Sequence, residues 1–183
     1  MTTRLYLVRH GKAAAGWDAD LDPGLDDLGH AQAAAMARDL VGAGPLDLVV
    51  SPLRRTRETV APLEAAWGRE ARVEPRVAEI PSDEPDLTAR GLWLRQIMVQ
   101  PWGALDPTLQ AWRRGVVDAL VALPRDTVVV SHFIAINVAV GVACGDDRVV
   151  NFQPDNCSVT RLDVVDGRLV LVARGHEAAT RVL

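Results

Sequence analysis

Leu5-Tyr6-Leu7-Val8-Arg9-His10-Gly11 is the stretch that says most about how this chain folds. Its first four residues are apolar and are typical of a short buried strand, and the polar residues after them mark a loop. A second stretch, Thr127-Val128-Val129-Val130, is apolar or β-branched throughout and ends in Ser131-His132. Two buried strands that each end near a histidine predict a sheet whose strand ends carry polar, reactive side chains.

The rest of the chain alternates between strand and helix patterns. Further strands are expected at 46–50, 159–165 and 168–173, and an extended segment is expected at 72–77. Helices are expected at 28–42, 52–67, 88–99, 108–123 and 133–142. This order predicts an α/β fold, a three-layer sandwich with a mainly parallel central sheet, helices on both faces and an antiparallel edge.

Composition limits the class of protein. The 183 residues, 49% of them apolar, are expected to form one domain over 1–183. A net charge of −4 argues against nucleic acid as a partner. No apolar run approaches the length that spans a bilayer, so no membrane association is expected. Cys144 and Cys157 lie far apart and are interpreted as reduced thiols, which favours a cytoplasmic location.

Five segments, taken in order, resemble the histidine phosphatase (phosphoglycerate mutase-like) superfamily, in particular its small phosphatase-type members. The segments are Arg9-His10-Gly11, the stretch 24–32, Ser51-Pro52-Leu53-Arg54-Arg55-Thr56-Arg57-Glu58-Thr59, Ala78-Glu79-Ile80-Pro81 and Val128-Val129-Val130-Ser131-His132. The first triplet is short and common, but five elements in the right order make chance agreement improbable. The resemblance extends along nearly the whole chain and implies that His10 carries a covalent phosphohistidine.

The expected phosphate pocket consists of Arg9, His10, Arg55 and His132. A neutral imidazole is a competent nucleophile at neutral pH. Guanidinium groups neutralise the phosphoryl oxygens, and they should also lower the pKa of His10, while His132 should donate a hydrogen bond to phosphate. Ser51 is expected to cap a helix that begins at Pro52, so that its amino end also favours an anion, as does the helix after His132.

A carboxyl group must protonate the leaving oxygen and then activate water. Glu79 is the expected catalytic acid and base, with Asp83 and Glu84 as alternatives, because the segment after Glu79 departs from that of the mutases. Lys12 follows the first motif directly and either contacts substrate, as a specificity element, or faces solvent.

The predicted function is that of a hydrolase, a metal-independent phosphomonoesterase with no cofactor, since His30 and His176 have no ligand spacing to the other histidines. The partner is expected to be a small phosphorylated metabolite or a phosphoprotein. Mutase-type phosphotransfer and protein-phosphohistidine hydrolysis are alternative reactions, and a non-catalytic phosphate-binding module is the alternative from another class. The sequence leaves the physiological substrate and the oligomeric state open.

Overall fold

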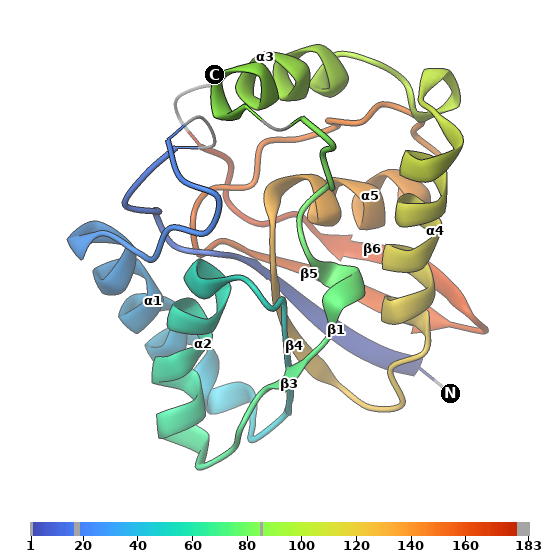
Figure 1. Ribbon diagram of the computed structural model, residues 1–183. Helices are drawn as coiled ribbons and strands as arrows, with labels where there is room; N and C mark the ends of the chain where they lie inside the picture. Colours follow the sequence, from blue (N-terminus) through green and yellow to red (C-terminus); the bar gives the residue numbers. More distant parts are fainter. Residues whose placement is uncertain (1, 17–18, 85, 179–183) are drawn as a thin grey trace.

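The computed structural model describes residues 2–16, 19–84 and 86–178, and a six-stranded sheet forms its centre (Figure 1). The strand order is β3-β2-β4-β1-β5-β6. The strands are β1 (Thr2–Arg9), β2 (Asp47–Val50), β3 (Arg72–Val73), β4 (Thr127–Ser131), β5 (Val159–Val165) and β6 (Arg168–Ala173). The first four strands are parallel, whereas β5 and β6 form an antiparallel edge.

In the described part of the chain, five α-helices lie around this sheet. They are α1 (Asp27–Leu40), α2 (Arg54–Trp67), α3 (Leu87–Met98), α4 (Pro107–Val121) and α5 (Phe133–Cys144). The helices α1 and α2 pack on one face, and α4 and α5 pack on the other. The predicted three-layer α/β sandwich, with its mainly parallel sheet and antiparallel edge, is therefore confirmed.

The two faces of the sheet bury alternate residues of the same strands, as the period of two in a strand requires. Leu7 and Val129 point toward α4 and α5, whereas Val8, Val128 and Val130 point toward α1 and α2. All five side chains are buried. Burial on both faces explains why β1 and β4 have continuous apolar runs rather than an alternating pattern.

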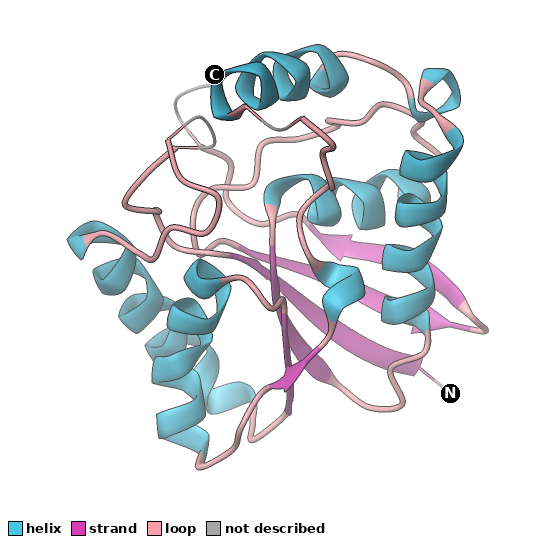
Figure 2. Cartoon of the chain, viewed as in Figure 1, coloured by secondary structure: helices cyan, strands magenta, loops and turns pink. Residues whose placement is uncertain are grey.

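The carboxyl ends of β1, β2 and β4 meet at one edge of the sheet. In register, Val8 lies opposite Val130, and Val130 lies opposite Val50, so the residues that follow these three strands are neighbours. Loops and α3 lie beyond this edge (Figure 2). Such an edge is where ligands bind in open α/β sheets.

Two predicted boundaries were wrong. The second helix begins at Arg54 and not at Pro52, because Leu53 keeps an extended backbone (φ −70°, ψ 142°). The segment 72–77, predicted to be extended throughout, is a strand only at Arg72–Val73, because the Glu74 side chain accepts a hydrogen bond from the amide of Arg76 and Pro75 begins a 3-10 turn. Among the described residues, no helix is both long enough and apolar enough to cross a membrane.

Candidate active site

Four side chains from the ends of three strands meet at the carboxyl edge of the sheet. His10 follows β1, Arg55 lies in the first turn of α2, and His132 follows β4. The ring centroids of His10 and His132 are 5.2 Å apart. Arg9, at the end of β1, completes a group whose members are all buried. The structure therefore brings together the four residues of the expected phosphate pocket.

The two ring nitrogens of His10 have different partners: Nδ1 contacts the backbone, and Nε2 faces Arg55. Its Nδ1 lies 2.7 Å from the carbonyl oxygen of Gly11, which can only accept, so Nδ1 carries the proton. Its Nε2 is therefore the unprotonated atom, and it accepts a hydrogen bond from Nε of Arg55 at 3.3 Å. Burial, with the charges of Arg55 and Arg9, lowers the pKa of His10 to about 3. The ring is neutral at pH 7, and Nε2 can act as a nucleophile.

Arg55 links the two histidines. Besides the contact to His10, its Nη2 lies 3.3 Å from Nδ1 of His132, and its Nη1 lies 3.9 Å from a carboxylate oxygen of Asp22. Its own backbone carbonyl accepts a hydrogen bond from Thr59, whose hydroxyl oxygen accepts one from the amide of Gly11. The helix α2 and the loop after β1 are thereby tied to each other at the site.

Two contacts hold the guanidinium group of Arg9 in place. Its Nη1 donates to the carbonyl of Pro154 at 2.9 Å, and its guanidinium carbon lies 5.2 Å from the centre of the Phe133 ring. Among the described residues, the buried Nε of Arg9 has no hydrogen-bond partner. A buried donor without an acceptor is unfavourable, so this atom is suited to an anionic ligand.

Glu79 lies beside this cationic group. It is buried, one carboxylate oxygen accepts from the amide of Ile80 at 2.9 Å, and the other lies 3.4 Å from the amide of Ile134. Burial raises the pKa of Glu79, although both amides and the nearby Arg55 and Arg9 act in the opposite direction. A carboxyl group with a raised pKa can give up a proton and take it back near neutral pH.

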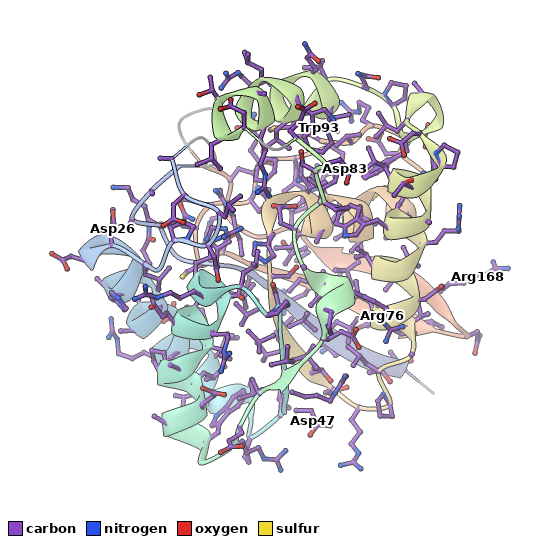
Figure 3. The ribbon with its side chains drawn as sticks, viewed as in Figure 1. Asp26, Asp47, Arg76, Asp83, Trp93 and Arg168 are labelled. Atoms are coloured by element: carbon purple, nitrogen blue, oxygen red, sulfur yellow. The ribbon has the colours of Figure 1, made fainter. Side chains whose placement is uncertain are left out.

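The two alternatives to Glu79 lie elsewhere. Asp83 and Glu84 are exposed and line a separate hollow with Trp93 and Asp106. Asp83 and Trp93 lie side by side near α3 in Figure 3. None of the three carboxylates lines the cavity in front of His10, but Glu79 is buried and interacts electrostatically with Arg55 and Arg9. The geometry favours Glu79 as the candidate acid.

Lys12 does not line the space in front of His10. Its side chain is exposed, and Nζ lies 2.8 Å from a carboxylate oxygen of Asp26, the N-cap residue of α1. Figure 3 shows Asp26 at the outer end of α1. Of the two expectations for Lys12, the arrangement favours a surface ion pair over substrate contact.

The space in front of His10 is a small cavity of about 40 Å³. Arg55 and Arg90 supply its positive charge, and the loop before α1 closes one side with residues that include Asp20 and Pro23. Arg90 lies on α3 and is a functional residue that the sequence did not predict. No motif identifies Arg90, since only the packing of α3 over the sheet edge brings it to the pocket.

Both helix ends that were expected to bind the anion already bind carboxylates. The amide of Arg54 at the start of α2 donates to Asp22 at 2.7 Å, and the amide of Ile134 near the start of α5 faces Glu79. The side chains of the arginines and histidines are thus the main candidates for phosphate contacts. Over the described part of the chain, no three His, Cys, Asp or Glu residues are grouped to hold a metal ion.

Comparison with known proteins connects this geometry to a family. The family model of the histidine phosphatase superfamily (branch 1) matches residues 5–176. The probable phosphoglycerate mutase GpmB of Erwinia tasmaniensis is 27% identical to this chain in an alignment that covers 87% of this chain and 84% of the length of GpmB. The glucosyl-3-phosphoglycerate phosphatase of Mycolicibacterium vanbaalenii is 32% identical in an alignment that covers 60% of this chain and 47% of the length of that phosphatase. The solved structure of a mycobacterial glucosyl-3-phosphoglycerate phosphatase superposes with a TM-score of 0.74, at 24% identity over 97% of this chain and 100% of that one.

Proposed function

Because the chain belongs to the histidine phosphatase superfamily (branch 1), we propose that it is a metal-independent phosphohydrolase that removes phosphate from small phosphomonoesters through a phosphohistidine on His10. One observation carries this proposal. The Gly11 carbonyl holds the proton on Nδ1 of His10, which leaves Nε2 unprotonated and directed toward Arg55. A binding site alone would not require a nucleophilic atom to be oriented in this way.

The first step transfers the phosphoryl group to His10. Nε2 attacks phosphorus, the new P–N bond forms, and the P–O bond to the alcohol breaks. Arg9 and Arg55 balance the charge on the phosphoryl oxygens, which is the main catalytic requirement of such a transfer. Glu79 gives its proton to the leaving oxygen, a role that its raised pKa supports.

The second step returns the enzyme to its starting state. The Glu79 carboxylate takes a proton from water, the water oxygen attacks phosphorus, and the P–N bond breaks to release inorganic phosphate. One carboxyl group therefore serves as acid and then as base. Nδ1 keeps its proton throughout and donates it in a hydrogen bond to the Gly11 carbonyl. The ring of His10 therefore returns to the same tautomer.

The small cavity favours a small substrate over a phosphoprotein. Its 40 Å³ in front of His10 is closed on one side by the loop before α1. Among the described residues between Glu79 and His132, α3, α4 and the short 3-10 turn Trp102–Ala104 are present, with no further helix or strand that could exclude water, which favours hydrolysis over mutase-type transfer. Mutase activity and protein-phosphohistidine hydrolysis remain the alternative reactions to be tested.

Arg90 favours a substrate with a carboxylate next to the phosphate. It lines the cavity with His10 and Arg55 and makes no ion pair with any described residue. Both curated relatives are named for phosphoglycerate compounds, which carry a carboxylate. A guanidinium group binds a carboxylate in a bidentate manner. We therefore propose phosphorylated hydroxy or amino acids as the substrate class.

The reaction is tested with p-nitrophenyl phosphate and a phosphomonoester panel, followed by denaturing quench and a search for acid-labile phosphate on His10. Wild type should turn over and become labelled, and His10→Ala should do neither. His30→Ala is the matched control, because His30 is exposed on α1. Tight phosphate binding without turnover by wild type would instead indicate the non-catalytic module. Interconversion of 2-phosphoglycerate and 3-phosphoglycerate without net phosphate release would indicate a mutase.

The substrate class is tested with O-phosphoserine and O-phosphoethanolamine, which differ by one carboxylate. Wild type should prefer phosphoserine, and Arg90→Gln should remove that preference, with a smaller loss in p-nitrophenyl phosphate turnover than in phosphoserine turnover. Arg95→Gln is the control, since Arg95 is exposed on the same helix and does not line the cavity. An unchanged preference in Arg90→Gln would exclude this role of Arg90 and leave the phosphatase activity itself standing.

A further inference from the structure

We propose that Ser51 is a positioning residue that fixes the tautomer of His132 and so presents Nδ1 of that ring to the phosphoryl group. This inference rests on the proposed function, since it concerns the same pocket. Ser51 directly follows β2, and the sequence pattern indicated only a helix cap for it. In the structure its hydroxyl oxygen also lies 2.7 Å from Nε2 of His132.

The partners of His132 determine which nitrogen carries the proton. A guanidinium group only donates, and Nη2 of Arg55 faces Nδ1 at 3.3 Å, so Nδ1 must be the acceptor. Burial, with the charges of Arg55 and Arg9, disfavours the charged ring, so one proton remains. That proton is on Nε2, which donates to the hydroxyl oxygen of Ser51.

Ser51 is itself held in place. Its amide donates to the carbonyl of Val130 at 3.1 Å, and its carbonyl accepts from the Thr56 hydroxyl at 3.0 Å. Its hydroxyl oxygen is also 3.3 Å from the amide of Leu53. Ser51 and His132 both have 0% of their surface exposed, so solvent water does not reach this hydrogen bond. A rigid, dry acceptor of this kind defines both the tautomer and the ring plane.

The hydrogen bond from Nε2 of His132 to Ser51 determines what Nδ1 of the same ring can do when phosphate binds. When a phosphate dianion occupies the pocket, Arg55 turns its donors to the phosphate oxygens, and the negative charge favours a proton on Nδ1. The ring takes this proton from solvent, keeps the other on Nε2, and donates from Nδ1 to a phosphate oxygen. His132 thus becomes the hydrogen-bond donor to phosphate only while Ser51 accepts from its opposite nitrogen.

Nitrogen-15 NMR of the imidazole groups, with and without inorganic phosphate, tests the assignment in the wild-type protein. Without phosphate, His132 should show a protonated Nε2 and an unprotonated Nδ1. With saturating phosphate, both nitrogens should be protonated. A proton on Nδ1 and none on Nε2 in the free protein would overturn the proposal, whatever the activity of the enzyme.

Two serine variants test the effect on the reaction. Ser51→Ala should lower kcat by about 10- to 100-fold, with a smaller change in KM, and the His132 signals should show a mixture of tautomers. Ser131→Ala is the matched control, because the buried hydroxyl of Ser131 donates to the Val77 carbonyl and to neither imidazole. Ser51→Thr keeps a hydroxyl and should restore the Nε2–H tautomer. Wild-type tautomer and kcat in Ser51→Ala, or an equal loss in Ser131→Ala, would overturn the inference.

Discussion

Gly11 and Gly29 are packed backbone against backbone, so that a Cβ atom on Gly11 would lie 2.6 Å from the carbonyl oxygen of Gly29. A Cβ on Gly29 would in turn overlap the carbonyl oxygen of Lys12. That same carbonyl accepts from the amide of Asp26, and the amide of Lys12 donates to Gln32. The loop that carries His10 is thus held against the start of α1, and both glycines are needed for the close approach.

Gly29→Ala should therefore displace the loop after His10. The contact is with rigid backbone, so we expect a loss of about 2 kcal/mol in unfolding free energy together with a lower kcat. Thermal or urea unfolding and p-nitrophenyl phosphate turnover measure the two effects. Gly42→Ala is the control, because a Cβ there meets nothing within 4 Å and should leave both quantities at their wild-type values. A fully stable and active Gly29→Ala protein would contradict the packing argument.

Arg55→Lys should lower kcat by roughly 10²- to 10³-fold, although the charge is kept. Arg55 uses Nε toward His10 and Nη2 toward His132, and a lysine ammonium cannot reach both positions. Steady-state kinetics with p-nitrophenyl phosphate provides the measurement. Arg57→Lys, at an exposed position in the same helical turn, should behave as wild type. Equal losses in the two variants would indicate a general effect of charge or of the helix rather than one of geometry.

Glu79→Gln should lower kcat by about 10²- to 10⁴-fold for an alkyl phosphate. The loss in the rate of His10 phosphorylation should be smaller for p-nitrophenyl phosphate, because p-nitrophenolate leaves without needing a proton, whereas hydrolysis of the phosphohistidine should slow equally with both substrates. Comparing the phosphorylation rates of the two substrates in single turnovers therefore separates loss of the acid from distortion of the site. Glu84→Gln is the control and tests the alternative acid directly, since Glu84 is exposed at another hollow. A larger loss in Glu84→Gln than in Glu79→Gln would transfer the role to Glu84.

The sequence predicted the parts of this protein that depend on local pattern. The apolar runs before His10 and before His132 define β1 and β4, and parallel pairing of buried strands brings their ends together. The bounds of β5 and β6 also agree with the prediction, since Asp166-Gly167 supplies a tight turn with positive φ at both residues.

The remaining features depend on tertiary contacts. Ser51 has the residue type and position of a helix cap, but its hydroxyl is engaged by His132, 81 residues away in the sequence. Arg90 is one arginine among many in the chain, and only the packing of α3 brings it to the cavity. The dominant cause of the low pKa of His10 is burial rather than the predicted cations, and burial of a loop residue has no local signature.

His10→Gln should make the protein more resistant to acid. The pKa of His10 is about 3 in the folded state and 6.5 when the ring is unperturbed, so between pH 6.5 and pH 3 the unfolded chain binds a proton that the folded protein does not. Stability that is present above pH 6.5 is therefore lost as the pH falls toward 3. When the pH falls from about 7 to about 5, this linkage lowers the free energy of unfolding of wild type by about 2 kcal/mol, and the glutamine variant does not show this loss. Urea unfolding at a series of pH values measures the difference, with His30→Gln at an exposed position as the control. Parallel pH profiles for wild type and His10→Gln would show that His10 takes up a proton within the folded protein, and its ring would then be charged rather than nucleophilic in mildly acidic solution.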